Sequence, residues 1–296
     1  MKKKIAILGS TGSIGQTLLN IISKNKKNFK IVLLTTNKNY RKLFDQAKKF
    51  NVKNLIITDK KIFLKIKNDK ISKGFNISNN FENLEKVFKN KKIDYVMSSI
   101  IGINGLYPTI KIIKHTKKIA IANKEAIICG WSLIKKELFK YKTIFIPVDS
   151  EHFSLWFGMK GIAKNISKIY LTASGGPFFK KDKESLKNVS ISSALNHPNW
   201  RMGKKISIDS ATMMNKVFEI IEARNIFDIP VNKISILTHP KSYIHAIIKF
   251  SNGMIKLIAH DTTMEIPIFN TLFSNENKKF KSFNIKLDLL NNLEFC

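Results

Sequence analysis

The N-terminal stretch 5–22 sets the strongest limit on the fold of this chain. Four apolar residues, Ile5–Leu8, precede glycines at positions 9, 12 and 15, and apolar residues then recur at helical spacing from Leu18 to Ile22. This order predicts a β-strand, a tight glycine turn and an α-helix, the unit that begins a dinucleotide-binding fold. Because the spacing G-x-x-G-x-x-G is one residue longer than the commonest fingerprint, a tight turn that binds nothing is the alternative.

Short apolar strands and helical stretches continue to alternate through residue 148. After a second strand at 30–34, the expected strands are 54–58, 93–101, 119–122 and 143–148, and the expected helices are 81–88, 108–114 and 125–140. Such alternation predicts an α/β fold with a doubly wound, Rossmann-like parallel sheet. We therefore assign residues 1–148 to a first domain of this class.

The turn after the second expected strand indicates which nicotinamide cofactor would bind. Folds that bind NAD usually place an acidic residue here to hold the ribose 2′-hydroxyl, but this chain has no acidic residue before Asp45. The segment Thr35–Asn39 carries hydroxyl and amide groups instead, and Arg41 and Lys42 follow. A cationic turn suits a 2′-phosphate, so the sequence favours NADP over NAD.

The net charge of +31 raises the possibility of a nucleic-acid partner. Of the 52 basic residues, however, only Arg41, Arg201 and Arg224 are arginines, and the lysines are spread through every segment. Because Lys, Asn, Ile and Phe share A/T-rich codons, we attribute the charge to genome composition and expect no specific nucleic-acid partner, only weak, salt-sensitive adhesion. With Cys129 and Cys296 as its only cysteines and no apolar run of membrane-spanning length, the chain is expected to be cytoplasmic, with no membrane partner.

A second, α+β domain is expected over residues 149–274. Asp149 and Glu151 stand two apart at an expected strand end, so their carboxylates would point the same way. Two like charges that face each other favour a bound cation, although a solvated strand end is the alternative. Near the end of this domain, residues 234–259 predict a meander of strands that includes the antiparallel pair 244–247 and 255–258.

Two further segments of the second domain could contact a ligand. Residues 169–177 predict a strand that runs into a Gly-rich turn. The aperiodic loop 196–203 places Trp200 between a proline and a glycine, where it would either close over a small ligand or plug the core.

Residues 204–222 carry the densest set of polar groups in the chain. Ile206 and Ile208 alternate with polar neighbours, which predicts a strand, and Asp209-Ser210 are good N-cap residues for a helix that follows. The apolar arc of that helix is formed by Met213, Met214, Val217, Phe218, Ile220 and Ile221, and the polar arc by Thr212, Asn215, Lys216, Glu219 and Glu222. The polar arc could hold an anion and a cation together. An ordinary amphipathic helix with a solvated polar face is the alternative.

With these pieces placed, the chain resembles the 1-deoxy-D-xylulose 5-phosphate reductoisomerase family over nearly its whole length. Six motifs occur in the family's order: GSTGSIG at 9–15, ANKE at 122–125, VDSEH at 148–152, TASGGPF at 172–178, HPNW-x-MG at 197–203 and ISIDSATMMNK-x-x-E at 206–219. The length of the last motif makes the match specific. The resemblance implies a metal-dependent, NADPH-dependent oxidoreductase of isoprenoid precursor synthesis that forms a homodimer.

The resemblance also implies a role for each matching position. The NADPH-binding residues would be Gly9, Thr11, Gly12, Ser13, Ile14, Asn37, Lys38, Asn39, Asn123, Glu125, Gly203 and Met264. The substrate, a small phosphate ester, would be bound by Lys124, Ser150, Glu151, Ser174, His197, Ser210, Asn215, Lys216 and Glu219. The catalytic set would be Lys124, Glu151, His197, Trp200 and Met202. One divalent cation, Mg2+, Mn2+ or Co2+, would be bound by Asp149, Glu151 and Glu219.

The reaction implied by the resemblance has two stages. The carbon skeleton of 1-deoxy-D-xylulose 5-phosphate rearranges to an aldehyde, and NADPH reduces that aldehyde to 2-C-methyl-D-erythritol 4-phosphate. Residues 275–296 would be a linker-like tail toward the helical domain that family members carry next. A truncated homologue that binds NADPH and phosphate without turnover is therefore an alternative. A third alternative, a semialdehyde or homoserine-type dehydrogenase, would need an active cysteine or another acid/base set, and Cys129 lies in a helix expected to be buried.

Overall fold

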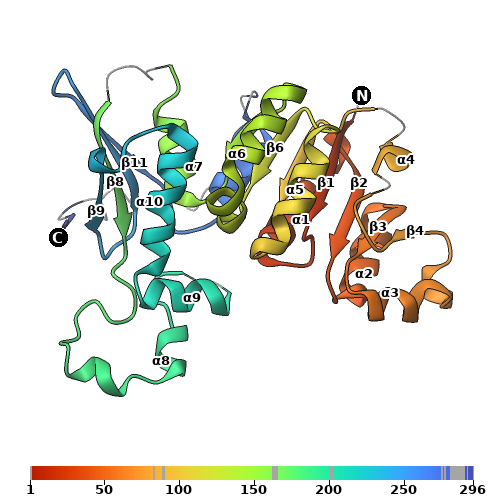
Figure 1. The fold of residues 1–296 in the computed structure, drawn as a ribbon, viewed down its shortest axis with the longest axis horizontal. Helices are drawn as coiled ribbons and strands as arrows, with labels where there is room; N and C mark the ends of the chain where they lie inside the picture. Colours follow the sequence, from red (N-terminus) through yellow and green to blue (C-terminus); the bar gives the residue numbers. More distant parts are fainter. Residues whose placement is uncertain are drawn as a thin grey trace. The chain divides into compact units, whose positions relative to one another are not determined.

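The chain divides into two compact units in the computed structural model (Figure 1). The first comprises residues 1–148 and 268–275, and the second comprises residues 149–267 and 276–296. The structure describes residues 2–82, 84–88, 91–161, 166–200, 203–274, 276, 278–280, 291 and 293–295. Met202, a predicted catalytic residue, and most of the expected tail 275–296 lie outside the described residues.

The first unit is built on a parallel sheet of seven strands in the order β4-β3-β2-β1-β5-β6-β7. The strands are β1 (Lys3–Leu8), β2 (Phe29–Thr36), β3 (Asn54–Ile57), β4 (Asn76–Ser78), β5 (Tyr95–Ser98), β6 (Lys118–Ile121) and β7 (Ile144–Pro147). Strand β1 pairs with β2 on one side and with β5 on the other, so the strand order reverses between β1 and β5. This arrangement confirms the predicted doubly wound sheet. In such sheets, ligands bind at the carboxyl ends of the strands, where the order reverses.

Helices connect the strands of the first unit. They are α1 (Ser13–Ser23), α2 (Tyr40–Phe50), α3 (Lys60–Lys67), α4 (Leu84–Phe88), α5 (Leu106–Ile113) and α6 (Lys124–Tyr141). Helices α2 and α3 were not predicted, because their apolar residues are interspersed with lysines and few of them are buried. In α2 the buried apolar residues are Leu43, Phe44 and Ala47, and in α3 the buried residue is Ile66.

The second unit contains a four-stranded mixed sheet in the order β11-β10-β8-β9. The strands are β8 (Ile166–Ala173), β9 (Ile234–Thr238), β10 (Ile244–Phe250) and β11 (Ile255–Ala259). The predicted antiparallel pair is confirmed, since Ile247 faces Leu257 across β10 and β11. The predicted meander is wrong, because β8 lies between β9 and β10, parallel to the first and antiparallel to the second. The α-helices described in this unit are α7 (Ser150–Gly158), α8 (Ile191–Leu195), α9 (Lys204–Ala211) and α10 (Met214–Phe227). Helix α11 (Glu265–Leu272) begins in the second unit and continues into residues 268–275 of the first.

The segment before α10 is helical, so the strand predicted from Ile206 and Ile208 is wrong. Helix α9 starts after Gly203, whose carbonyl accepts from Ser207 N at 3.0 Å. An ion pair one turn apart, Lys205 Nζ to Asp209 Oδ2 at 2.6 Å, supports this helix. Two alternating isoleucines are too short a pattern to distinguish a strand from a helix. The expected helix start at residues 209–210 is also wrong, because Met213 adopts φ +61° and α10 begins after it.

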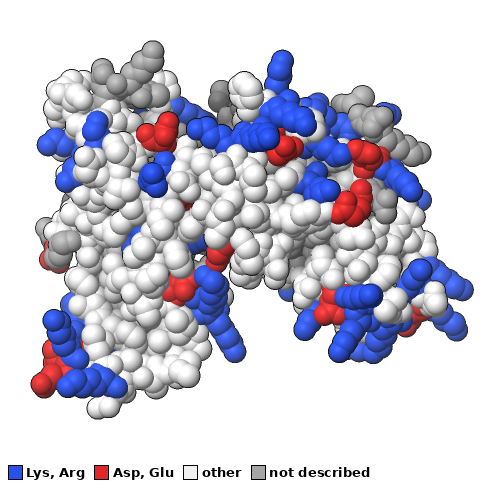
Figure 2. Space-filling view, in the orientation of Figure 1, with Lys and Arg blue, Asp and Glu red and all other residues white. Residues whose placement is uncertain are grey.

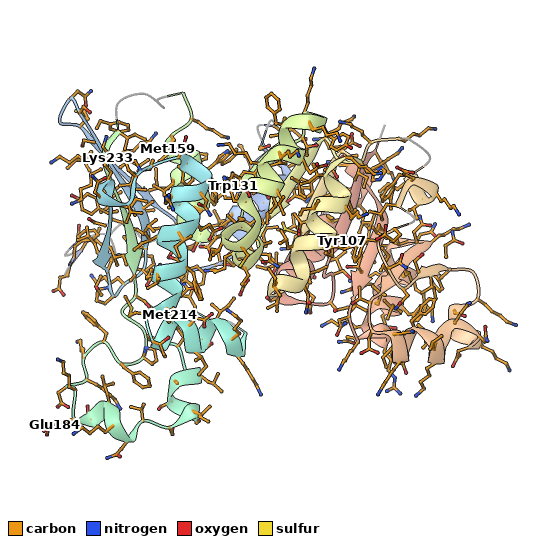
Figure 3. The ribbon with its side chains drawn as sticks, in the orientation of Figure 1. Tyr107, Trp131, Met159, Glu184, Met214 and Lys233 are labelled. Carbon is orange, nitrogen blue, oxygen red and sulfur yellow. The ribbon has the colours of Figure 1, made fainter. Side chains whose placement is uncertain are left out.

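Helix α10 buries its polar groups and exposes part of its apolar arc. Lys216, Glu219 and Glu222 are buried, whereas Met214, labelled in Figure 3, is 42% exposed and Val217 is 45% exposed. The interpretation of α10 as an ordinary helix with a solvated polar face is therefore wrong. Buried charges destabilise a fold unless they are paired, and α10 finds partners for them within the second unit.

Basic side chains are distributed over many surface elements (Figure 2). On the face drawn there, one group of them lies over α2 and α3. Cys129 is exposed, so the expectation that it is buried in its helix is wrong. Among the described residues, no helix is both long enough and apolar enough to cross a bilayer.

Candidate functional site

The glycine turn between β1 and α1 is sterically restricted to glycine at two positions. Gly9 has φ +83°, and a Cβ there would lie 2.8 Å from Ser99 O. A Cβ on Gly15 would lie 2.6 Å from Gly9 O, so the helix can approach the turn only without a side chain. Gly12 is the N-cap of α1, and within the described residues no side chain caps this helix start. Its first-turn N–H groups are therefore suited to an anion such as a pyrophosphate.

The turn after β2 presents the residues predicted to bind the 2′-phosphate, and all three are exposed. Asn37 Nδ2 donates to Thr58 Oγ1 at 2.9 Å, which orders the turn. Asn39 caps α2 by accepting from the backbone N–H of Lys42. Lys38 is 75% exposed, and its Nζ lies 3.8 Å from Asp59 Oδ2, so its ammonium is the accessible cation of this turn.

Asn123 ties together two connections of the first unit. Its Oδ1 accepts from Ala126 N at 2.7 Å, so Asn123 caps the start of α6. Its Nδ2 donates to Gly102 O at 2.8 Å and also to Ile100 O, in the segment that follows β5. Lys124, the first residue of α6, is buried, and the neighbouring Glu125 is half-buried. The two other predicted cofactor residues, Gly203 and Met264, belong to the second unit.

Three carboxylates converge in the second unit. Asp149 is the N-cap residue of α7, Glu151 lies in the first turn of that helix, and Glu219 lies on α10. Oxygen atoms of these three side chains lie within 4.8 Å of one another. The strand β7 ends at Pro147, near the predicted end, but Asp149 and Glu151 lie at the start of α7. The carboxylates therefore come together at a helix start, and the prediction that strand alternation aligns them is wrong. Three carboxylate oxygens are the ligands that Mg2+ and similar hard cations prefer.

Donors that were assigned to the substrate are bonded to two of these carboxylates. Lys216 Nζ donates to Glu219 Oε2 at 2.6 Å and also to Glu151 Oε1. Asn215 Nδ2 donates to Glu219 Oε1, and Ser150 Oγ donates to Glu151 Oε2 at 2.5 Å. The four carboxylate oxygens of Glu151 and Glu219 thus each accept a hydrogen bond from a predicted substrate ligand.

Burial sets the electrostatics of this group. Burial and the nearby Glu219 raise the pKa of Glu151 to about 7, although Lys216 opposes the rise. Burial by itself lowers the pKa of Lys216, but Glu151 and Glu219 outweigh it and raise that pKa above its usual value. The site therefore keeps a protonated lysine among carboxylates that repel one another, and this excess of negative charge fits a divalent cation.

His197 is held as a neutral ring by its neighbours. Its Nδ1 accepts from the backbone N–H groups of Asn199 and Trp200 at 3.2 and 3.0 Å, so Nδ1 carries no proton. Its Nε2 lies 3.0 Å from Ser174 Oγ and is the ring's donor. Burial lowers the pKa of His197, and the Lys216 ammonium lowers it further, which agrees with a neutral imidazole.

The turn after β8 lies against the end of α9. Gly176 has φ +71°, and a Cβ there would lie 2.9 Å from Ser210 O. Its backbone N–H donates to Ser174 Oγ at 3.1 Å. Because only glycine permits this approach, the turn brings Ser174 and Ser210 into one region of the second unit.

The loop that carries Trp200 is anchored on the strand connection between β9 and β10. Asn199 Nδ2 donates to Pro240 O at 2.6 Å and to Ser242 Oγ at 2.9 Å. The Trp200 ring meets the His245 ring edge to face, with 5.9 Å between centroids. Trp200 is half-buried, so its side chain is only partly accessible to a ligand.

Two buried groups beside the carboxylates, His152 and Glu222, were not among the predicted site residues. His152 Nε2 lies 2.9 Å from Glu219 O, and its Nδ1 lies 3.6 Å from Asp149 Oδ1 and 3.5 Å from Glu222 Oε2. Burial by itself lowers the pKa of His152, but Glu222 and Asp149 outweigh it and raise that pKa to about 9. Sequence spacing could have indicated both residues, because His152 lies one helical turn beyond Asp149 and Glu222 lies one turn beyond Glu219.

Comparison with known proteins identifies the family. Two family models match the chain. The one described as 1-deoxy-D-xylulose 5-phosphate reductoisomerase matches residues 5–130, and the one described as the C-terminal domain of that enzyme matches residues 145–227. The 1-deoxy-D-xylulose 5-phosphate reductoisomerase of Pelagibacter ubique (strain HTCC1062) is 60% identical over 297 residues, which cover 98% of this chain and 76% of the relative. The chain belongs to the 1-deoxy-D-xylulose 5-phosphate reductoisomerase family.

Solved reductoisomerase structures agree with this assignment. The reductoisomerase from Zymomonas mobilis in complex with NADPH matches with a TM-score of 0.89 and 32% identity, covering 100% of this chain and 76% of that one. A reductoisomerase in complex with NADPH, fosmidomycin and magnesium matches with a TM-score of 0.90 and 32% identity, covering 99% and 75%. The predicted family and fold class are therefore confirmed.

Proposed function

We propose that this chain catalyses the reductoisomerisation of 1-deoxy-D-xylulose 5-phosphate to 2-C-methyl-D-erythritol 4-phosphate, with NADPH and one divalent cation. The observation that carries the proposal is the convergence of Asp149, Glu151 and Glu219 within 4.8 Å. Around these carboxylates lie donors suited to a phosphate ester, among them Lys216. The family to which the chain belongs, and its solved members in complex with NADPH and magnesium, support the same assignment.

The three carboxylates would bind the cation, Mg2+, Mn2+ or Co2+. Once bound, the cation would act as a Lewis acid on the ketone oxygen and an adjacent hydroxyl oxygen of the substrate. Glu151 and Glu219 are both buried enough that water does not screen their charges, so they attract a divalent ion strongly. Asp149 would complete the set from the start of α7.

The substrate phosphate would bind to side chains of the second unit. We assign this role to Ser174, Ser210, Asn215 and Lys216, with Ser150, Glu151, Glu219 and Lys124 along the rest of the molecule. His197, neutral and protonated on Nε2, would donate to a substrate oxygen from the position where it now contacts Ser174. Binding energy gained at the phosphate, away from the reacting carbons, can be used in the transition state.

The first unit would bind NADPH, which supplies the hydride that reduces the aldehyde. The predicted contacts are Gly9, Thr11, Gly12, Ser13, Ile14, Asn37, Lys38, Asn39, Asn123, Glu125, Gly203 and Met264. The first-turn N–H groups of α1 would hold the pyrophosphate. The exposed ammonium of Lys38 would hold the 2′-phosphate. The loop with Trp200 and Met202 would close over the substrate and exclude water.

We also propose that the two predicted domains bind different ligands. Residues 1–148 would bind NADPH, and residues 149–274 would bind the cation and the substrate. A homodimer and a cytoplasmic location accompany the family assignment as proposals, and sedimentation of the purified chain would test the first.

The direct test is an assay of the purified chain with NADPH, 1-deoxy-D-xylulose 5-phosphate and Mn2+, with and without EDTA. We expect NADPH to be oxidised only when the cation is free to bind, and we expect mass spectrometry to identify 2-C-methyl-D-erythritol 4-phosphate. If NADPH binds but is not oxidised, the chain would be a homologue that binds its ligands without turnover.

A further inference from the structure

The side chain of Asn199 attaches the loop 196–200 to the turn between β9 and β10. Its Nδ2 donates to Pro240 O at 2.6 Å and to Ser242 Oγ at 2.9 Å. These acceptors lie 41 and 43 positions further along the chain. An Asn in a turn usually bonds to backbone groups only two or three residues away. The side chain of Asn199 therefore joins two distant segments of the second unit.

The turn that receives Asn199 is itself bonded to the end of β8. His239 is fully buried, and its backbone N–H donates to Ala173 O at 2.7 Å. Ser242 N donates to His239 O at 2.9 Å and closes the turn. Ala173 is the last residue of β8, and Ser174 follows it directly. The turn and Ser174 are thus parts of one hydrogen-bonded frame, to which Asn199 is attached.

The backbone at Asn199 holds the ring of His197. The N–H groups of Asn199 and Trp200 donate to His197 Nδ1 at 3.2 and 3.0 Å. A ring nitrogen that accepts two hydrogen bonds carries no proton, so the proton of the neutral ring is on Nε2. That Nε2 lies 3.0 Å from Ser174 Oγ. Two backbone N–H groups therefore fix both the direction of the ring and its tautomer.

These hydrogen bonds form a closed circuit around His197. It runs from Ser174 through the His197 ring to Asn199, from there to the β9–β10 turn, and back to Ala173 beside Ser174. The side chain of Asn199 is the link between the loop and the turn. Without it, the N–H groups that hold Nδ1 would move with their loop instead of with the sheet.

We propose that Asn199 is a positioning residue for His197, an inference that rests on the proposed function. Its Nδ2 holds the loop on the β9–β10 turn, and its backbone N–H, with that of Trp200, keeps Nδ1 of His197 as an acceptor. Nε2 of His197 is thereby kept as the donor that faces the substrate. A displacement of about 1 Å at such a group can lower a rate about 100-fold, so the Asn199 side chain affects turnover without touching the substrate.

The test uses two replacements of Asn199 and one of its acceptor. Asn199→Ala removes both hydrogen bonds of the side chain, and Asn199→Asp keeps its volume but has no N–H to donate to Pro240 O. Ser242→Gly removes only the hydroxyl acceptor, and glycine tolerates the φ of +55° at this position. Asn54→Ala is the control, because Asn54 is also half-buried and its Nδ2 donates to a backbone carbonyl, Val32 O, in the first unit.

Two measurements are made on each variant once circular dichroism and urea unfolding have shown that it is folded. The first is kcat/KM for 1-deoxy-D-xylulose 5-phosphate, together with the KM for NADPH. The second is a long-range proton–nitrogen NMR spectrum of the chain with 15N-labelled histidine, without cation, substrate or NADPH. It is recorded above the pKa of free histidine, and the signals of His197 are assigned by their loss in His197→Gln. Only the second measurement is independent of the proposed function.

We expect kcat/KM to fall about 10- to 100-fold in Asn199→Ala and at least as far in Asn199→Asp. Ser242→Gly should lose less, because the bond to Pro240 O remains, and Asn54→Ala should match the wild type. The KM for NADPH should not change in any variant. In the wild-type spectrum Nδ1 of His197 should carry no proton. In Asn199→Ala the two nitrogen signals should approach each other, because the ring then exchanges between its two tautomers.

Two outcomes would overturn the proposal. An unchanged His197 spectrum in folded Asn199→Ala would show that the side chain does not hold the ring. A changed spectrum with wild-type kcat/KM would show that the tautomer of His197 has no bearing on turnover. If the wild type turns over no substrate, the proposed function fails, and the spectra alone decide whether Asn199 positions the ring.

Discussion

Lys216 Nζ donates to Glu219 Oε2 at 2.6 Å, and the same ammonium also donates to Glu151. A residue assigned to the substrate phosphate is thus bonded to two residues assigned to the cation. A cation that binds Glu151 and Glu219 must share or displace this ammonium. When it does so, Lys216 becomes available to a phosphate, so cation and phosphate binding should favour each other. Such coupling is reciprocal by thermodynamic necessity.

Replacing Lys216 with Gln should separate these two roles. Removal of one partner of a buried ion pair leaves uncompensated charge, so the free energy of unfolding without cation should fall by about 3–5 kcal/mol. Mn2+ should restore the lost stability. The variant should bind Mn2+ more tightly than the wild type does and inorganic phosphate more weakly. Urea unfolding with and without Mn2+ measures the first effect, and calorimetry measures the others.

Lys205→Gln is the matched control for this prediction. It removes an ion pair of the same kind on α9, but the Lys205 side chain is 45% exposed. Exposed pairs contribute within about 1 kcal/mol, so unfolding and Mn2+ affinity should hardly change. Equal effects of the two substitutions on unfolding and Mn2+ affinity would refute the proposed link between Lys216 and the cation ligands.

The pKa of Glu151, raised to about 7 by burial, predicts how stability and cation binding depend on pH. Its folded pKa lies above the unfolded value of 4.5, so between these values the folded chain holds a proton that the unfolded chain has released. The free energy of unfolding without cation should therefore decrease as pH rises through this window. Glu151→Gln should flatten the decrease. A slope unaffected by this substitution would contradict the assignment.

Mn2+ binding should depend on pH for the same reason. A carboxylate must lose its proton before it can bind the cation, so affinity should rise from about pH 5 to pH 7 and binding should release protons. Calorimetry in two buffers of different ionisation enthalpy measures the number released. No proton release in the lower part of this range would mean that Glu151 is already ionised there.

Gly176→Ala should weaken phosphate binding, an effect that the positive φ of Gly176 does not explain by itself. Both Gly176 and Gly253 have positive φ, so Ala at either position should cost about 1–2 kcal/mol of stability. Only at Gly176 would the new Cβ lie 2.9 Å from Ser210 O, whereas among the described residues nothing lies within 4 Å of a Cβ at Gly253. We expect Gly176→Ala to weaken binding of inorganic phosphate about tenfold or more, and Gly253→Ala to leave it unchanged. Equal phosphate affinity in the two variants would rule out this role for the turn.

The parallel sheet of the first unit could be predicted because short, contiguous sequence patterns mark its strands and its glycine turn. The apolar run Ile5–Leu8 is fully buried in β1, and the three glycines that follow form the turn. In a parallel sheet each central strand is covered on both faces, so a continuous apolar run predicts its position well. The helices α2 and α3 were missed because only a narrow apolar stripe of each contacts the sheet.

The burial of α10 could not be predicted from its own sequence. A helical wheel gives two faces but does not say which one meets the protein, and apolar content is normally the guide. Here Lys216 and Glu219 are buried because Glu151 and His152 on α7 provide partners for them. Those partners lie about 65 residues away in sequence, since Lys216 and Glu151 are separated by 65 positions. The resemblance to a family named the residues, but only the structure shows that two donors assigned to the phosphate are bonded to carboxylates assigned to the cation.

We propose above that Asp149, Glu151 and Glu219 bind the cation that the reaction requires. The most direct measurement is the rate of NADPH oxidation with 1-deoxy-D-xylulose 5-phosphate as Mn2+ is increased, for the wild type and for Glu219→Gln. We predict saturable Mn2+ dependence in the wild type and a loss of about 100-fold or more in Glu219→Gln with NADPH still bound, because Lewis-acid catalysis supplies several kcal/mol. Oxidation that persists in EDTA, or wild-type turnover in Glu219→Gln, would show that these carboxylates do not bind a required cation.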